Sequence, residues 1–479
     1  MTSPEAGRRG GGHVVVLGAG PAGLWAAWRA AQAGHQVTVL EREARVGGLT
    51  ASFELAGVRV DHGSHRLHRA TDPAVLATLR GLLGDELQVR PRAGRIRLSG
   101  RWLGFPLTPA GIVTGLPPAF AARALADALL PSRRALPEGA DPDTYDAVVR
   151  SRLGPTMADR FYGPYAVKMW GRPPDQLAAE QARRRIGASS PGALVRRVLA
   201  GRDPEARTFL YPRRGFGRIA EVLAEAATDA GASIRLSTTV TGVRPADRDR
   251  LASVTCDAGD HLDATAVLST LPLPVLPRLV RAGGGDVPDG VLAAGGGLRA
   301  RAMVLVYLVL PSPPWTRFDA HYLPESWTPV TRVSEPRRYR EAPEDPDDVT
   351  VLCAEVPCDV GDATWTASTR TLRDVVTTTL ERAGLPPAVV LDTHVVRVPS
   401  AYPVLDLAAP ARQDVVEGWA SALRGVRTLG RQGLFAHDNT HHAIAMAEAA
   451  VAATTPDGRL DPGPWAAARE GFRDHVVED

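Results

Sequence analysis

The chain has 479 residues, too many for one simple core, which predicts two or three domains or a cofactor domain with large insertions. The formal net charge is only +3 and no basic stripe is interleaved with aromatic residues, so we expect no nucleic-acid partner. No apolar run reaches the roughly 18 residues of a membrane span. Cys256, Cys353 and Cys358 form no CxxC pair and lack histidines at ligand spacing, which predicts a cytoplasmic location and no metal site.

A strand, a glycine loop and a helix follow one another near the start of the chain. Residues 1–12 are polar and glycine-rich and predict a disordered tail, residues 14–17 predict a buried strand, and residues 24–33 a helix. The loop between them reads Gly18-Ala19-Gly20-Pro21-Ala22-Gly23. Its three glycines permit a tight turn, a close approach of the backbone to a pyrophosphate, and close packing of helix on sheet. Residues 36–40 predict a second strand, so this βαβ unit predicts a dinucleotide site at the start of the helix.

The rest of the chain alternates between helical and strand-rich stretches. Residues 53–61 predict a hairpin that turns at Ala56-Gly57, and residues 67–202 predict helices with a short strand pair near Ile96 and Trp102. The apolar stretch 105–130 is broken by prolines and favours buried helices or a dimer face over a membrane surface. Further strands are expected within 233–243, 252–256, 264–270, 303–310, 330–333, 349–356 and 426–430, and further helices within 219–230, 371–383 and 441–453.

Glu41 closes the second strand, where a carboxylate can accept hydrogen bonds from ribose hydroxyls. The sequence that follows it, Arg42 to Leu49 with Gly47-Gly48, resembles the second motif of the FAD-dependent amine oxidase and protoporphyrinogen oxidase superfamily. Two more segments match, Tyr211 to Gly217 before a helix and Leu429-Gly430-Arg431 before the last helix. The resemblance implies FAD as the cofactor, bound by Gly18, Gly20, Pro21, Ala22, Gly23, Glu41, Arg42, Gly47, Gly48, Leu49, His65, Val240, Gly430, Asn439 and Thr440.

The implied fold is α/β: a glutathione-reductase-like, Rossmann-type FAD domain with a mostly helical insertion and a second, sheet-containing substrate domain. The FAD domain is expected in three parts, at residues 13–66, 205–275 and 425–455. The helical substrate or cap insertion is expected at 67–204, the substrate domain at 276–424, and a C-terminal tail at 456–479.

One segment narrows the resemblance to a branch. Residues 161–171, Phe-Tyr-Gly-Pro-Tyr-Ala-Val-Lys-Met-Trp-Gly, resemble a segment of UDP-galactopyranose mutases, which implies Trp170 in a nucleotide-sugar cleft. Lys168 is the only lysine of the chain, which favours a buried pairing over a surface position. Arg185 and Arg332 match arginines that bind the substrate diphosphate, and His65 matches a histidine beside the reactive flavin nitrogen. The implied catalytic residues are His65, Arg185 and Arg332, and the implied substrate contacts are Lys168, Trp170, Arg185, Arg332, Tyr402 and His437.

Two departures from that branch leave the reaction open. Ala166 and His437 stand where the mutases have an asparagine that contacts uracil and a tyrosine. The leading hypothesis is a pyranose/furanose mutase of a nucleotide diphosphate sugar, with reduced flavin as the nucleophile. The alternative is an FAD-dependent oxidase or desaturase of a secondary-metabolite intermediate, and the third is a non-catalytic flavoprotein. A homodimer is possible under each of them.

Overall fold

A sheet of five parallel strands contains the N-terminal strand. The computed structural model describes residues 11–186, 208–257, 259–475 and 477, so residues 1–10 of the expected tail lie outside the described residues. The strand order is β19-β13-β1-β2-β9, and every neighbouring pair is parallel. The strands are β1 (His13–Leu17), β2 (Gln36–Leu40), β9 (Ser233–Arg235), β13 (Ala266–Ser269) and β19 (Val426–Thr428).

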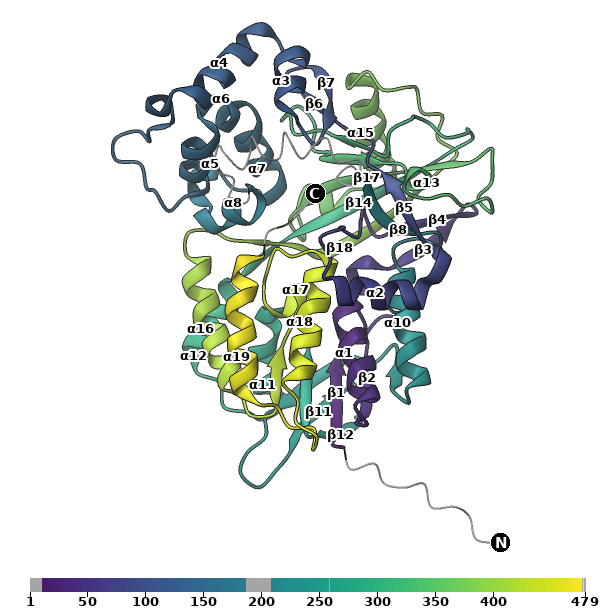
Figure 1. Ribbon diagram of the computed structural model, residues 1–479, viewed down its shortest axis with the longest axis vertical. Helices are drawn as coiled ribbons and strands as arrows, with labels where there is room; N and C mark the ends of the chain where they lie inside the picture. The colour runs from purple at the N-terminus through teal and green to yellow at the C-terminus, as the bar shows by residue number, and fades with distance from the viewer. Residues whose placement is uncertain (1–10, 187–207, 258, 476, 478–479) are drawn as a thin grey trace.

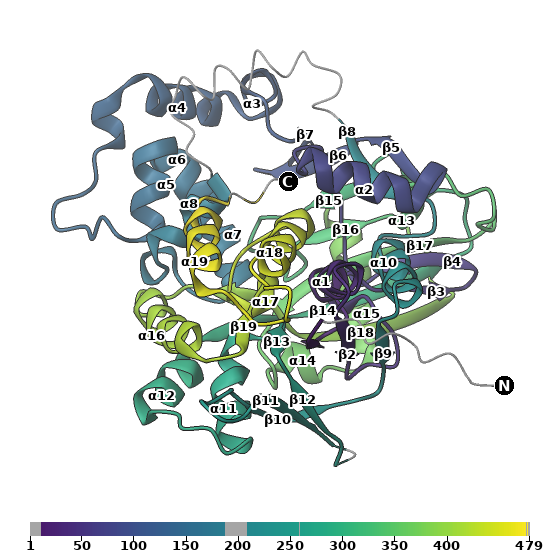
Figure 2. The same ribbon diagram turned by 60° about the horizontal axis from the view of Figure 1, so that its bottom comes forward.

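Both faces of this sheet are covered, which explains why β1 is apolar at every position after His13. Val14 and Val16 pack into a core with helices α1, α10 and α18, whereas Val15 and Leu17 pack with the sheet β10-β11-β12 and helix α11. Figure 2 shows the three helices on one side of the sheet and the small sheet on the other. The predicted α/β class is therefore confirmed. These covering elements are α1 (Pro21–Gln32), α10 (Arg218–Asp229), α18 (Thr440–Ala452), α11 (Leu276–Ala282), β10 (Val240–Arg244), β11 (Ala252–Cys256) and β12 (His261–Ala264).

A second, seven-stranded sheet lies above the first in Figure 1, in the order β18-β14-β17-β16-β15-β6-β7. Its hairpin β6-β7 comes from the stretch expected to be mostly helical, and β6 joins the sheet by parallel pairing with β15. Such a pairing joins residues far apart in the sequence, so no local pattern predicts it. The strands are β6 (Gly94–Leu98), β7 (Arg101–Phe105), β14 (Arg299–Leu310), β15 (Ala320–Tyr322), β16 (Arg332–Ser334), β17 (Thr350–Cys358) and β18 (Asp392–Val404).

Two strand pairs form small sheets of their own. The hairpin of β3 (Ser52–Leu55) and β4 (Val58–Asp61) turns at Ala56-Gly57, as expected, and both residues have positive φ, at 50° and 78°. β5 (Leu87–Pro91) pairs with β8 (Thr208–Pro212). The hairpin β3-β4 leads directly into residues 62–66, and His62, Ser64, His65 and Arg66 line the cavity described below.

Helices of the insertion form a separate layer at the upper left of Figure 1. Within the stretch 105–130, Phe120 is buried while Leu125 and Leu129 are exposed. No helix among the described residues is long and apolar enough to cross a bilayer. The remaining helices are α2 (Pro73–Leu83), α3 (Pro109–Gly115), α4 (Pro118–Leu129), α5 (Tyr145–Leu153), α6 (Pro155–Met157), α7 (Gly163–Trp170), α8 (Ala179–Ile186), α12 (Asp289–Gly297), α13 (Pro336–Tyr339), α14 (Ala363–Thr366), α15 (Thr369–Arg382), α16 (Ala409–Ala422), α17 (Gly430–Gly433) and α19 (Pro462–Gly471).

Candidate functional site

One cavity of about 620 Å³ runs from the glycine loop after β1 to the inner face of the second sheet. This volume is in the usual range for a cofactor or small-molecule site. Its walls come from the loop after β1, the end of β2, residues 48–53, residues 62–68, strand β18 and the start of α18. Segments far apart in the sequence therefore build one continuous site.

The three glycines of the first loop have three different surroundings. A Cβ atom on Gly18, whose φ is +100°, would lie 2.3 Å from the Thr270 Oγ1, and one on Gly23 would lie 2.0 Å from the Gly18 carbonyl oxygen. A Cβ atom on Gly20 would meet no atom within 4 Å, because Gly20 faces the cavity. No side chain caps the first turn of α1, so its N–H groups are open to a ligand. This arrangement fits the diphosphate of a dinucleotide.

Glu41 borders the same end of the cavity and is held by the backbone. Its carboxylate oxygens accept hydrogen bonds from the N–H of Ala19 (2.8 Å) and of Glu43 (2.9 Å). Each carboxylate oxygen has a further lone pair that can accept a ribose hydroxyl. Gly47 donates its N–H to the Ala19 carbonyl oxygen (2.8 Å), so the second motif packs on the first loop.

Of the other predicted FAD contacts, all but two line the cavity. Asn439 is the N-cap of α18, so this helix also directs its N-terminus at the site. The two exceptions are Gly47, whose N–H binds the glycine loop through the Ala19 carbonyl oxygen, and Val240, which lies in β10. Neither residue lines the described part of the cavity. The residues that line it are Gly18, Gly20, Pro21, Ala22, Gly23, Glu41, Arg42, Gly48, Leu49, His65, Gly430, Asn439 and Thr440.

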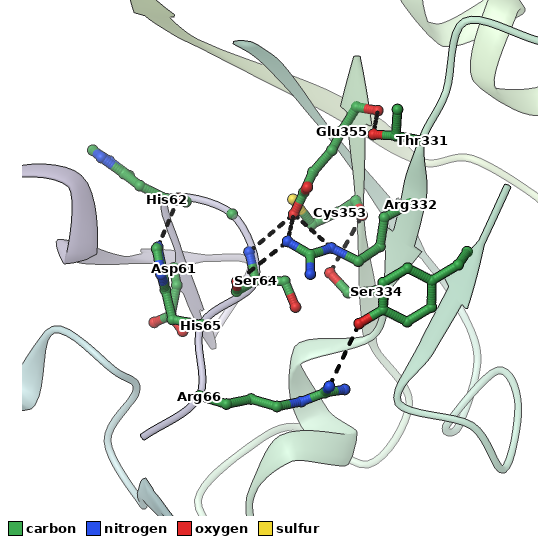
Figure 3. A network of polar contacts seen from close by, with 12 residues as sticks. Asp61, His62, Ser64, His65, Arg66, Thr331, Arg332, Ser334, Cys353 and Glu355 are labelled. Atoms are coloured by element: carbon green, nitrogen blue, oxygen red, sulfur yellow. Dashed lines mark hydrogen bonds and ion pairs between the residues drawn. The ribbon is translucent and has the colours of Figure 1, made fainter. Parts of the chain in front are cut away.

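His65 lies on the loop after β4, which is anchored by Asp61 (Figure 3). The Asp61 carboxylate accepts hydrogen bonds from the Ser52 Oγ (2.6 Å), the Phe216 N–H (3.0 Å) and the Tyr211 hydroxyl. The His65 ring stacks on Phe216, and its Nε2 lies 3.1 Å from the His62 carbonyl oxygen. Burial lowers the pKa of His65, although Asp61 opposes this shift. His65 is therefore a neutral imidazole on the cavity wall, with its proton on Nε2.

Arg332 is fixed on β16 by a buried carboxylate (Figure 3). Its Nε and Nη2 donate to the Glu355 Oε1 (3.0 and 2.6 Å), and the same oxygen accepts the Ser64 N–H (3.1 Å). Burial lowers the pKa of Arg332, but Glu355 raises it well above the usual value, so the guanidinium stays charged. Within the described part of the chain, no acceptor takes a hydrogen bond from Nη1. Arg332 thus keeps one donor group for a ligand.

Arg66 was not predicted from the sequence, yet it lies beside Arg332. Its Nη2 forms an ion pair with the buried Asp319 (2.9 Å), and its Nη1 lies 3.5 Å from the Tyr322 hydroxyl. The Tyr322 ring also packs under the Arg332 guanidinium, 5.6 Å away. Because arginine is so common in this chain, the sequence alone gave no reason to single out Arg66 as a site residue. Glu355 did carry one, as the single charged residue of the otherwise buried and uncharged strand β17.

The predicted substrate contacts divide into two groups. Tyr402 and His437 line the cavity and stack on each other, with ring centroids 5.5 Å apart, and the Arg431 guanidinium lies over Tyr402. Trp170 is 2% exposed and packs behind His437, and it is not among the described residues of the cavity wall.

Lys168 and Arg185 complete the set of predicted substrate contacts. The Lys168 Nζ donates to main-chain oxygens rather than lining the cavity. The only lysine of the chain is therefore partly buried and paired with the main chain. Arg185 belongs to α8, but its side chain lies outside the described residues.

Comparison with known proteins shows to which family the chain belongs. The model of the family described as flavin containing amine oxidoreductase matches residues 21–453. The chain belongs to this family. The predicted superfamily and the FAD cofactor are thereby confirmed, and the protein is an FAD-dependent enzyme of amine oxidase type.

Solved structures share the fold of this chain, and the similar proteins carry names of different activities. A reduced UDP-galactopyranose mutase superposes with a TM-score of 0.77 at 21% identity, covering 95% of this chain and 97% of that one. A putative protoporphyrinogen oxidase from Exiguobacterium sp. 255-15 gives a TM-score of 0.70 at 18% identity, covering 92% and 98%. A phytoene dehydrogenase from Streptomyces griseus is 28% identical over 291 residues, or 56% of each chain. An L-amino acid oxidase from Crotalus durissus cumanensis is 51% identical over 55 residues, 12% of this chain and 11% of that protein. The matches thus span little more than half of the phytoene dehydrogenase and about a tenth of the L-amino acid oxidase.

Proposed function

We propose that this family member is a mutase that interconverts the pyranose and furanose forms of a nucleotide diphosphate sugar. The observation that supports this best is a set of polar side chains, Arg66, Tyr322, Arg332 and Tyr402, which line the cavity together with apolar residues such as Val396 and Val398. A few convergent polar groups in such a wall orient a ligand and provide its specificity. Planar guanidinium groups match the oxygens of a diphosphate.

The positive charge of the cavity also supports a diphosphate as the ligand. The start of α1 already serves the FAD diphosphate, so the arginines at the other end are available for a second anion. Buried carboxylates hold Arg332 and Arg66 in place, which lowers the entropy lost when a ligand binds. The described wall contains more arginines than carboxylates, even when Asp319 and Glu355 behind it are added: Arg42, Arg45, Arg66, Arg92, Arg332, Arg397 and Arg431, against Glu41, Glu43 and Asp438.

Each side chain then has a defined task. When bound, reduced FAD supplies a nucleophilic nitrogen for the anomeric carbon. Arg332 and Arg66 bind the diphosphate oxygens as charge develops on the leaving group. His65 holds its proton on Nε2 and presents Nδ1 as an acceptor. Tyr402, backed by His437, forms a rigid wall that orients the nucleotide.

A second candidate is a redox enzyme, an oxidase or desaturase. The likeness to a phytoene dehydrogenase over 56% of each chain favours it. A cytoplasmic location and a homodimer remain predictions under both candidates.

The number of product molecules formed after a single reduction of the flavin distinguishes the mutase from the redox enzyme. The enzyme is reduced once without oxygen and incubated with a panel of nucleotide sugars, and products are followed by chromatography and mass spectrometry. We expect many turnovers and a product of unchanged mass, because a mutase returns its electrons in every cycle. One electron pair transferred per product, starting from oxidised FAD, would instead establish the redox enzyme. If no nucleotide perturbs the flavin spectrum in either redox state, both the mutase and its substrate class are wrong.

Arg332→Ala tests the substrate contact directly. We expect binding of uridine diphosphate to weaken by about 2–4 kcal/mol, the scale for removing one partner of a desolvated charge pair, with the flavin spectrum intact. Arg185→Ala is expected to act in the same way. Arg373→Ala is the control and should bind as the parent does, because Arg373 is a partly exposed arginine paired with Asp374 outside the cavity wall. Unchanged binding in Arg332→Ala would remove this residue from the site.

A further inference from the structure

Lys168 reaches from the helical insertion to the second sheet. It lies on α7, and its Nζ donates to the carbonyl oxygens of Leu323 (2.5 Å) and Val330 (3.0 Å). These two residues stand at opposite ends of the loop 323–331, which joins β15 to β16. One ammonium group therefore bridges both sides of the loop where it leaves the sheet.

The bridged loop is flanked on each side by a residue of the cavity wall. Tyr322 is the last residue of β15 and Arg332 the first of β16, and the two are direct cross-strand partners. The Leu323 N–H donates to the Thr331 carbonyl oxygen (2.8 Å), which closes the base of the loop. Lys168 thus binds the main chain immediately beside Tyr322 and two residues before Arg332.

We propose that Lys168 is a positioning residue that fixes the 323–331 loop and so sets where Tyr322 and Arg332 stand in the cavity. It acts through these two residues, so its effect on substrate rests on the proposed function. The chain uses arginine at every other cationic side chain, yet it has lysine here. A compact ammonium can donate to two converging carbonyl oxygens from one atom, whereas a planar guanidinium spreads its donors over a rigid fork.

The surroundings of Lys168 make this bridge sensitive to pH. Burial lowers the pKa of Lys168 to about 7, against a weaker opposite effect of Glu325. Glu325 is itself paired with Arg97 and accepts the Gly100 N–H (2.9 Å), and Lys168 forms no ion pair with any described residue. A charged donor makes stronger hydrogen bonds than a neutral one. As pH rises through about 7, Lys168 loses its proton, the bridge weakens, and the positive charge near Arg332 falls.

The test measures binding of uridine diphosphate and of inorganic pyrophosphate by the FAD-loaded enzyme across pH. For the parent we expect affinity to fall about tenfold between about pH 6 and pH 8.5, the range that spans the lowered pKa. Lys168→Met should bind weakly at every pH with unchanged FAD content, and its profile should lose the fall above about pH 7 and keep only the dependence that comes from ionisation of the phosphate ligand itself. Lys168→Arg keeps the charge and should not restore the parent affinity. Arg160→Met, an exposed residue close to α7 in sequence, is the control and should keep the parent profile.

Amide hydrogen exchange provides a second measurement that needs no nucleotide. In Lys168→Met the amides of residues 322–332 should exchange about tenfold faster, because local opening of the loop becomes easier. Unchanged exchange there, or a parent pH profile retained in Lys168→Met, would overturn the role of Lys168. If neither probe binds the parent, the proposed substrate class fails, and the exchange rates alone still decide whether Lys168 fixes the loop.

Discussion

The Glu41 carboxylate stabilises the protein backbone and also has lone pairs for the cofactor. It accepts the N–H groups of Ala19 and Glu43, and its position at the end of β2 directs it to the cavity. Its removal should therefore loosen the glycine loop and also delete the ribose acceptor.

For Glu41→Ala we expect FAD affinity to fall by about 1–3 kcal/mol, the scale for lost hydrogen bonds to a charged acceptor. Titration of the apoprotein with FAD, followed by flavin fluorescence, measures this loss. Glu41→Gln keeps one acceptor oxygen and should lie between the parent and Glu41→Ala. Glu54→Ala, an exposed glutamate on β3, is the matched control. Equal FAD affinity in Glu41→Ala and the parent would show that Glu41 does not bind the ribose.

At the scale of elements, the glycines in the turn from β1 into α1 have different roles: one allows close packing and another borders the ligand cavity. Gly23 allows α1 to approach the backbone of Gly18, while Gly20 only borders the cavity. A glycine-to-alanine substitution should therefore lower the stability of the protein at position 23 and weaken FAD binding at position 20.

Gly23→Ala places a Cβ atom 2.0 Å from the Gly18 carbonyl oxygen, so α1 must move. We expect the apoprotein to lose about 1–3 kcal/mol of unfolding free energy, the usual cost of overpacking. Gly20→Ala meets open space, so the apoprotein should keep the parent melting temperature but bind FAD more weakly. Thermal melts with and without FAD test both variants. A stable Gly23→Ala, or a Gly20→Ala with parent FAD affinity, would contradict this division.

Elements with local signals were predictable, and those that depend on distant partners were not. The buried strand, the glycine loop and Glu41 are neighbours in sequence, so their pattern predicts the first half of the FAD site. Strand β18 contains Pro399 and Pro403, which argue against a strand, but β18 is an edge strand, where proline is tolerated. The pairing of Arg66 with Asp319 joins residues 253 positions apart and leaves no mark in the local sequence.

Across the whole molecule, the cavity joins segments near residues 18–53, 270–272, 394–402 and 430–443. FAD bound there contacts elements from both ends of the chain, so it should stabilise the fold as a unit. At a free concentration of about 100 times Kd, a ligand of the folded state adds about 2.7 kcal/mol. We expect a single melting transition that shifts upward with FAD concentration, measured by calorimetry, with a smaller shift in Gly20→Ala. A rise confined to one of two separate transitions would show that the two halves unfold independently.

The strand order of the parallel sheet also dictates when the protein can first hold its cofactor in the cell. β1 and β2 leave the ribosome early, but β13 ends at residue 269 and β19 at residue 428, and the start of α18 follows at residue 440. Chains are made from the N-terminus at about 5–20 residues per second, so β1 waits many seconds with its apolar edge uncovered. Flavin loading therefore belongs to the last stage of translation or after it. Until residue 269 has been made, the edge of β1 that pairs with β13 stays without its partner strand.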